Sequence, residues 1–426
     1  MKYKKYSKYK DSGVEWIGEV PEGWEVKKLK YSVDLYSKKS NGNANERPYV
    51  GLEHIESQTG RLIPDFPITF EGDSKEFDSG DVLFGKLRPY LAKAILADFA
   101  GTCSGELLVL RGNDIKPDLL HHLVLSDGFI QLVNSATYGV KMPRAEWSMI
   151  GNIFIPIPKE KEQNEIYDFL QKQTTQFDEL IAKSKAQVTL LEEKRQATIN
   201  QAVTKGLDPS VPMKDSGVEW IGEIPEHWEV IGLTKCCDII SGTGFPVQYQ
   251  GNINYEFPFY KVNDTNLLNN RVYMNDCNNT IKKEDINILK AKIAPKNSIV
   301  FPKIGAALLK NKRRILTKPS IFDNNMMALV PKRHNEKFLY YFLLVVDFAM
   351  ITNPGPVPSL GDSNIRLVKA PLPPILEEDK IADFLDKQTT QFDELIAKSK
   401  AQVTLLEEKR QALITATVTG KIDVRK

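Results

Sequence analysis

The sequence predicts an α+β fold in which two globular domains are joined by two long antiparallel coiled-coil helices, with a pseudo-twofold internal repeat. Three observations lead to this prediction. A stretch of helical pattern, Lys172–Ala197, returns without change as Lys387–Ala412. A shorter stretch, Lys10–Val26, returns as Lys214–Val230 with only two substitutions. The regions between the repeats differ in sequence and contain short β-rich runs separated by Gly, Pro, Asn and Asp, as globular domains do.

Residues 1–26 comprise an N-terminal tail and the first short repeat. The tail, MKYKKYSKYK, carries five lysines and lacks the apolar segment of a signal peptide. This composition favours a disordered, solvated tail, and a nucleic-acid contact is the alternative. The sequence also holds no apolar run long enough for a membrane span.

Each short repeat is followed by a variable region of ordinary domain size, residues 27–160 and residues 231–375. Each region shows β-rich runs, such as DVLFGKL and NSIVFPKI, and a predicted short helix, near Leu119–Val133 and Lys337–Met350. Residues 206–230 form the linker and the second short repeat between them. Matching prolines near the ends of the two regions indicate a shared frame: Pro143, Pro156 and Pro158 in the first, and Pro358, Pro371 and Pro373 in the second.

The copied stretches lie in two long predicted helices, within residues 161–205 and 376–426. No Pro or Gly interrupts residues 162–204, and Gly420 ends the second helix. Apolar residues recur at coiled-coil spacing, which predicts that each helix packs along the other; a long helix inside one globular core is the alternative. The predicted seam consists of Leu170, Phe177, Ile181, Val188, Leu191, Leu385, Phe392, Ile396, Val403 and Leu406.

The order of the repeats predicts that the two termini meet. The first helix leads directly into the second short repeat, whereas the second helix leads only to the C-terminus. The first short repeat can complete the second unit if the chain ends lie close together. Two equivalent units with antiparallel helices then result, as in a symmetric dimer built within one chain.

No motif in the sequence supplies a catalytic centre. Neither G-x-x-x-x-G-K-[ST] nor a strand followed by G-x-G-x-x-G is present. The four cysteines form no C-x-x-C and have no His at metal-ligand spacing, so we expect free thiols in a reducing cytoplasm. These are Cys103, Cys236, Cys237 and Cys277. We predict no catalytic residue, no metal site and no bound cofactor on this chain.

Polar side chains suited to DNA contact gather in both variable regions. Residues 231–375 hold 19 Lys and Arg against 10 Asp and Glu, whereas residues 27–160 hold 16 against 17. DNA binding by the first region therefore requires its basic residues to gather on one face. Arg, Lys and Asn can bond base edges or phosphates; the alternative for each is an ordinary solvated loop. The candidates are Lys86, Arg88, Tyr90, Lys93, Tyr138, Lys141, Arg144, Lys261, Asn263, Lys303, Lys310, Lys312, Arg313, Arg314, Asn324 and Asn325.

This arrangement resembles the specificity subunit of type I restriction-modification enzymes. The motifs that carry the resemblance are IGE-[VI]-PE-x-WEV at each domain start, GDVLFGKLRPYLAKA and GTCSGELLVLR in the first domain, and PFYKVND, VFPKIGAALLKNKRRIL and DNNMMAL in the second. IPIPKEKEQ at the first helix entry is also typical. LPPILEEDK departs from the pattern, with Glu378 and Asp379 where the family usually has Glu-Gln.

The resemblance implies a non-catalytic subunit. Each variable domain would be a target recognition domain that reads one half of a split double-stranded DNA site. The helices would set the spacer and dock two methyltransferase (modification) subunits, with restriction/translocase subunits in the full complex. S-adenosylmethionine, ATP and Mg would be bound by those partners. The alternatives are a DNA-binding regulator that acts alone, a fused restriction-modification enzyme, which the missing cofactor loops and the 426-residue length oppose, and a coiled-coil adaptor.

Overall fold

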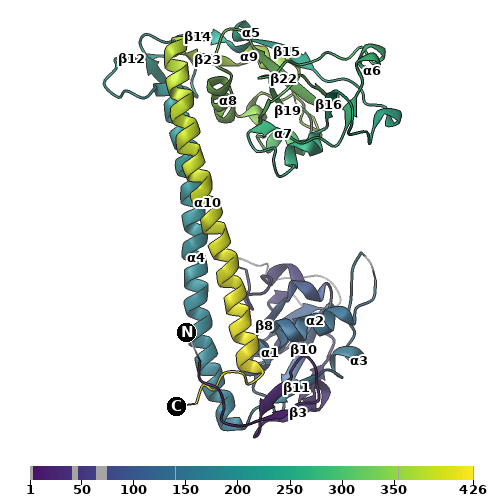
Figure 1. The fold of residues 1–426 in the computed structure, drawn as a ribbon. Helices are drawn as coiled ribbons and strands as arrows, with labels where there is room; N and C mark the ends of the chain where they lie inside the picture. Colours follow the sequence, from purple (N-terminus) through teal and green to yellow (C-terminus); the bar gives the residue numbers. More distant parts are fainter. Residues whose placement is uncertain (1–2, 41–46, 64–73, 140, 354, 426) are drawn as a thin grey trace. The chain divides into compact units, whose positions relative to one another are not determined.

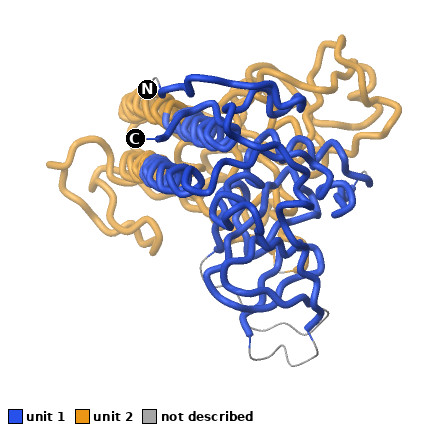
Figure 2. The backbone as a smooth tube through the Cα atoms, turned by 90° about the horizontal axis from the view of Figure 1, so that it is seen from below, with its two compact units in different colours: residues 1–186, 399–426 blue, residues 187–398 orange. Residues whose placement is uncertain are grey.

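The chain forms two compact units, each built around one variable region (Figures 1 and 2). The computed structural model describes residues 3–40, 47–63, 74–139, 141–353 and 355–425. Unit 1 comprises residues 1–186 and 399–426, and unit 2 comprises residues 187–398. Each unit therefore holds one variable domain together with a part of each long helix.

The variable domain of unit 1 carries, among its described residues, a four-stranded antiparallel sheet and a three-stranded sheet. The first has the order β4 (Val33–Tyr36), β10 (Leu107–Gly112), β7 (Val82–Gly85), β8 (Ala94–Leu96). The second has the order β5 (Tyr49–Val50), β9 (Gly101–Ser104), β6 (Ser74–Phe77). Helices α1 (Pro117–Val124), α2 (Asp127–Ser135) and α3 (Trp147–Ile150) and the 3-10 turns Leu29–Tyr31, Leu52–His54 and Pro89–Leu91 complete it.

The variable domain of unit 2 repeats this plan, with one further strand in the larger sheet among the described residues. Its larger sheet has the order β15 (Cys237–Ser241), β22 (Met326–Pro331), β19 (Ile299–Pro302), β20 (Arg314–Leu316), β17 (Tyr273–Met274). The smaller sheet has the order β18 (Thr280–Ile281), β16 (Phe257–Tyr260), β21 (Ile321–Phe322). The helices are α5 (Leu233–Cys236), α6 (Lys283–Ile288), α7 (Ala306–Leu309), α8 (Glu336–Val345) and α9 (Asp362–Leu367), with 3-10 turns at Val247–Tyr249, Val262–Asn266 and Phe348–Ile351.

Alternation along the central strand divides the interior of each domain into two cores. In β7, Val82 and Phe84 face the core that α1, α2 and the long helices share, whereas Leu83 faces the smaller sheet. This is the two-residue period of a strand that is buried on both faces. In β19 the same division separates Phe301 from Val300. The short run predicted as a strand in each region therefore forms the centre of its domain.

The short repeats join each domain to the ends of the long helices. Their strands are β1 (Tyr9–Asp11), β2 (Glu19–Pro21) and β3 (Glu25–Lys28), and β12 (Met213–Asp215), β13 (Glu223–Pro225) and β14 (Glu229–Gly232). β3 pairs with β11 (Phe154–Ile157), and β14 pairs with β23 (Lys369–Leu372). Trp24 and Trp228 are fully buried at equivalent places. They pack beside Gly420 and Gly206, whose φ angles of 73° and 72° suit only glycine well.

The long helices are confirmed as α4 (Glu160–Lys205) and α10 (Ile375–Val418). Within unit 1, Asp178 pairs with Arg410 at 2.8 Å and Lys185 pairs with Glu407 at 3.0 Å, so the helices run antiparallel there. Unit 2 holds the equivalent pair, Arg195 with Asp393, also at 2.8 Å. The predicted seam positions lie on the buried or half-buried face of each helix.

The prediction of a disordered N-terminal tail is wrong for the residues that the structure describes. The segment that begins at Tyr3 packs against unit 1, because a tyrosine recurs at every third position. The Tyr6 hydroxyl donates to Glu162 at 2.5 Å. The ring centroids of Tyr3 and Phe169 lie 5.7 Å apart in an edge-to-face arrangement. The predicted meeting of the termini is confirmed, since the Asp423 N–H donates to the Lys4 carbonyl at 2.8 Å.

Candidate nucleic-acid interface

In unit 1 the two loops that carry most of the candidate residues are hydrogen-bonded to each other. The first loop, residues 86–93, leaves the end of β7, and the second comprises residues 138–139 and 141–145. The Arg88 N–H donates to the Pro143 carbonyl at 2.7 Å, and the Ala145 N–H donates to the Lys86 carbonyl at 2.9 Å. We call this pair of loops the two-loop platform. It brings together basic residues of a region that has no net positive charge, as DNA binding by that region requires.

Unit 2 contains the same platform, built from residues 303–310 and from residues 353 and 355–360. The Gly305 N–H donates to the Pro358 carbonyl at 2.8 Å, and the Leu360 N–H donates to the Lys303 carbonyl at 2.8 Å. The Lys303 N–H also donates to the Asn325 carbonyl at 2.8 Å, directly before β22. In unit 1 the N–H of Lys86 donates to the Glu106 carbonyl at 3.0 Å, directly before β10. Each of these three backbone hydrogen bonds in one platform therefore has a counterpart in the other.

These matched hydrogen bonds align the side chains of the two platforms. Lys86 corresponds to Lys303, and Arg88 corresponds to Gly305. Tyr138 and Arg144, which pair with each other through their backbones, correspond to Asn353 and Ser359. Sequence reasoning missed Gly305, Asn353 and Ser359. In the second loop, the matching prolines at positions 143 and 358 show which residues correspond. In the first loop, this correspondence follows only from the backbone hydrogen bonds between the two loops.

The candidate side chains on the unit 1 platform differ in exposure and in the hydrogen bonds and ion pairs that they already form. Arg88, Tyr90, Tyr138 and Lys141 are exposed. The Tyr138 hydroxyl donates to Glu146 at 2.8 Å, and this hydrogen bond raises the pKa of Tyr138. Arg144 forms an ion pair with Glu106 at 2.5 Å. The Lys93 ammonium donates to the Leu52 carbonyl at 2.7 Å, so Lys93 fastens the loop to the 3-10 turn Leu52–His54.

Candidates in unit 2 fall into two groups. Lys303, Lys310, Asn324 and Asn325 lie on or beside the platform, and the Lys303 ammonium donates to the Ser241 hydroxyl at 3.4 Å. The second group surrounds the 3-10 turn Val262–Asn266. There the Lys261 ammonium donates to Gln250 at 3.1 Å, the Asn263 side-chain oxygen accepts from Asn266 at 3.2 Å, and the Lys312 ammonium bonds Asn266.

Two candidates in unit 2 must be corrected. Arg313 is only 1% exposed; its guanidinium donates to the Val346 carbonyl at 3.1 Å and lies 4.0 Å from the Phe348 ring centroid. Burial lowers the pKa of Arg313 to about 9. Arg314 donates to the carbonyls of Asn270 and Thr265, and burial lowers its pKa as well. These side chains hold the interior of the domain together, because the basic run enters the buried strand β20 instead of remaining in a solvated loop.

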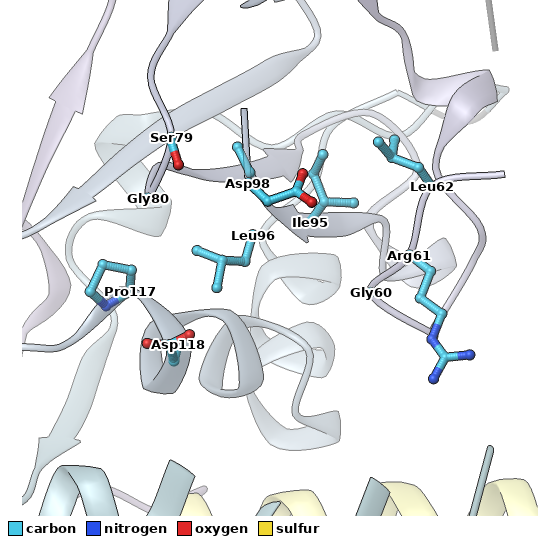
Figure 3. Close-up of a pocket in the computed structure, with 11 residues that line it drawn as sticks. Gly60, Arg61, Leu62, Ser79, Gly80, Ile95, Leu96, Asp98, Pro117 and Asp118 are labelled. Atoms are coloured by element: carbon cyan, nitrogen blue, oxygen red, sulfur yellow. The ribbon is translucent and has the colours of Figure 1, made fainter. Parts of the chain in front are cut away.

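A separate hollow of about 510 Å³ lies on unit 1 between the end of β8 and the start of α1 (Figure 3). Its polar lining comes from Arg61, Ser79, Asp98 and Asp118. The DNA-binding candidates do not line it, so the hollow is distinct from the platform.

Across the part of the chain that the structure describes, no three His, Cys, Asp or Glu side chains gather closely enough to hold a metal ion. In the same residues, no helix combines the length and apolar character needed to cross a bilayer. Cys103, Cys236 and Cys237 are buried free thiols, and Cys277 is half-buried and free.

Comparison with known proteins gives consistent matches to one family. The model of the type I restriction modification DNA specificity domain matches residues 21–190 and 225–405. The specificity subunit of the type I restriction enzyme MjaVIII from Methanocaldococcus jannaschii is 25% identical over 441 residues, covering 95% of this chain and 94% of that protein. The MjaIX specificity subunit of the same organism is 22% identical over 431 residues, covering 96% of this chain and 95% of that protein.

A solved chain gives the same result for the fold. It comes from work on complex assembly and conformational transition of the type I R-M system, and it aligns with a TM-score of 0.73 at 20% identity. The alignment covers 94% of this chain and 98% of that chain. At this identity the match establishes a shared fold.

Proposed function

Because this chain belongs to the type I restriction-modification DNA specificity family, we propose that each variable domain reads one half of a split DNA site through its two-loop platform. The observation that carries this proposal is the pair of equivalent platforms. Their backbone hydrogen bonds match, while most of their exposed side chains differ. Two domains that read different sequences need the same backbone arrangement but different side chains, because a base edge is recognised by the hydrogen-bond donors and acceptors placed against it.

The long helices dock the modification subunits in this proposal, one on each copy of the repeated surface. Leu180 is 50% exposed and its counterpart Leu395 is 48% exposed, and Leu190 and Leu405 are exposed to a similar extent. Exposed leucines at identical places in both copies favour one kind of partner bound twice. In unit 1 this surface includes an apolar hollow of about 530 Å³ beside Leu180.

The chain itself is non-catalytic in this proposal. Adenine methylation with S-adenosylmethionine and ATP- and Mg-dependent cleavage take place on modification and restriction/translocase partners, in the cytoplasm. This division of labour follows from the family and from the absence of phosphate-binding and dinucleotide-binding motifs in the sequence.

Co-expression with candidate modification subunits tests the proposal. Mapping of modified adenines across a genome should show one split, asymmetric site that depends on this chain. Modification without a defined site, or the same site in a strain that lacks this chain, would refute the proposal.

A second experiment tests whether the helices set the spacer. Seven residues inserted into both α4 and α10 preserve the seam and lengthen each helix by about 10 Å, or about three base pairs of duplex. Modification should be lost or should move to sites with a longer spacer and unchanged half-sites. A four-residue insertion, which breaks the seam, should be more damaging. Full activity at the original spacer would show that the helices do not set the distance.

A further inference from the structure

The two platforms allow shared side chains to be separated from those that differ. Both domains meet the same DNA backbone but, under the proposed function on which this inference rests, different bases. A side chain that is identical at an equivalent place in two otherwise different domains suits the feature that all DNA shares, which is the phosphate. A side chain that differs suits the base that only one half-site presents.

Lys86 and Lys303 are the shared cations of the platforms. Each directly follows the central strand of its domain, and each is held by matched backbone hydrogen bonds at both its N–H and its carbonyl. Among the residues that the structure describes, no hydrogen bond or ion pair engages the Lys86 ammonium, and the Lys303 ammonium has only the 3.4 Å contact with Ser241. A lysine ammonium acts as a point charge, which suits a phosphate better than the fixed pattern of a base edge.

Arg88 is the cation that the two platforms do not share. Its side chain is exposed in the first loop, and no ion pair or hydrogen bond holds its guanidinium within the described residues. Its backbone lies in the left-handed region, with φ 52° and ψ 60°, directly before Pro89. The counterpart Gly305 also has a positive φ, 72°. Unit 1 thus carries a long cationic side chain at a strained position where unit 2 has the residue that suits the backbone.

We infer that Lys86 and Lys303 bind DNA phosphates in the two half-sites and that Arg88 reads a guanine in the half-site of the first domain. A guanidinium donates in parallel to O6 and N7 of guanine, which is the commonest specific contact of this side chain. The second domain reads the equivalent position without such a contact, because Gly305 has no side chain to offer.

The inference is tested on the full chain with duplex DNA. Wild type first selects its site from a library of random duplexes, and binding to the selected and a scrambled duplex is then measured against salt. Arg88→Gly should lose roughly 5- to 150-fold affinity for the selected duplex and little for the scrambled one. Repeated selection with this variant should lose the preference for guanine at one position of one half-site. Since position 88 already has a glycine-type backbone, the variant should fold at least as well as wild type.

Lys86→Ala and Lys303→Ala should each weaken both duplexes by a similar factor and lower the salt slope by about 0.9. Arg88→Lys serves as the matched variant, because it keeps the charge and loses the two-pronged contact, so its base preference should relax as that of Arg88→Gly does. Lys235→Ala, an exposed lysine on α5, should leave affinity and slope unchanged.

An unchanged selected site in Arg88→Gly, or a base other than guanine at the affected position, would overturn the assignment of Arg88. A loss confined to the selected duplex in either lysine variant would overturn the phosphate assignment. These outcomes differ from failure of the proposed function, in which wild type itself would select no site.

Discussion

Replacing one arginine in each copy of the same helical sequence should have unequal effects, because the two domains bury the arginines differently. Arg410 and Arg195 occupy equivalent places, and each bonds its aspartate at 2.8 Å. The Arg410 side chain is 8% exposed and its partner Asp178 is 14% exposed; for Arg195 and Asp393 the values are 22% and 44%. Arg410 also donates to the carbonyls of residues 58 and 59, at 3.4 and 3.3 Å.

The burial sets the expected magnitudes. Breaking a buried pair leaves an uncompensated charge and costs about 3–5 kcal/mol, whereas breaking an exposed pair costs about 1 kcal/mol or less. Arg61 still reaches Asp178 at 2.7 Å, so the Arg410→Ala loss should lie at about 2–3 kcal/mol. Arg195→Ala should cost about 1 kcal/mol or less in unit 2.

Hydrogen exchange measured by mass spectrometry on the full chain resolves the two effects, because it reports local opening free energies and does not require the whole chain to unfold in one step. Peptides that cover residues 56–61 and 170–186 report on Arg410→Ala, and peptides that cover residues 385–398 report on Arg195→Ala. Equal losses in the two variants, or a larger loss for Arg195→Ala, would refute the argument from burial.

Three further predictions concern the stability of single elements. Gly420→Ala should lower the free energy of unfolding, measured by thermal denaturation, by at least about 1 kcal/mol. The φ of 73° disfavours Ala, and the new methyl group would lie 2.4 Å from Pro21 of the first short repeat. Gly217→Ala is the control, because Gly217 has a similar φ but open space where its Cβ would lie. Arg313→Ala should destabilise unit 2 by about 2 kcal/mol or more in urea denaturation. The salt dependence of DNA binding should not change, and a lower salt slope would show that Arg313 contacts DNA. Burial lowers the pKa of His121 to about 4 and of His122 to about 3, below the unfolded value of about 6.5. Their contribution to stability is therefore complete above about pH 6.5 and falls as pH drops toward 3. Exchange protection of α1 should decline over that range, and a decline that persists in a His121→Asn, His122→Asn variant would assign it to other groups.

The repeats made most of the fold predictable from the sequence. Helix α4 fills the stretch between Pro158 and Gly206, and α10 ends at Val418, just before the predicted stop at Gly420, because proline and glycine end helices. The lysine-rich tail was predicted wrongly, since its lysines suggested solvation while Tyr3 and Tyr6 determine its packing. Hydrophobic contacts formed by a few aromatic side chains outweighed the composition of the segment.

The candidate site was predicted only in part, because its frame depends on hydrogen bonds between distant loops. Basic residues near positions 88 and 141 could be identified as candidates, and the matching prolines 143 and 358 gave the register of the second loop. The equivalence of Arg88 with Gly305 appears only in the backbone hydrogen bonds that these residues donate to Pro143 and Pro358. Arg313 shows the opposite failure. A run of charged residues predicts a solvated loop. Arg313 is nevertheless buried beside Phe348, where it has a structural role.

In the proposed function each variable domain reads one half of a split site, and this reading is independent of the other domain. It is tested most directly by a chain in which residues 27–160 are replaced by a second copy of residues 231–375, co-expressed with the modification subunits that support the wild-type chain. The modified sites of the two chains are then mapped. The new site should contain the second half-sequence twice, and the first half-sequence should be lost. Retention of the first half-sequence in the modified sites would show that the two domains do not read their half-sites independently.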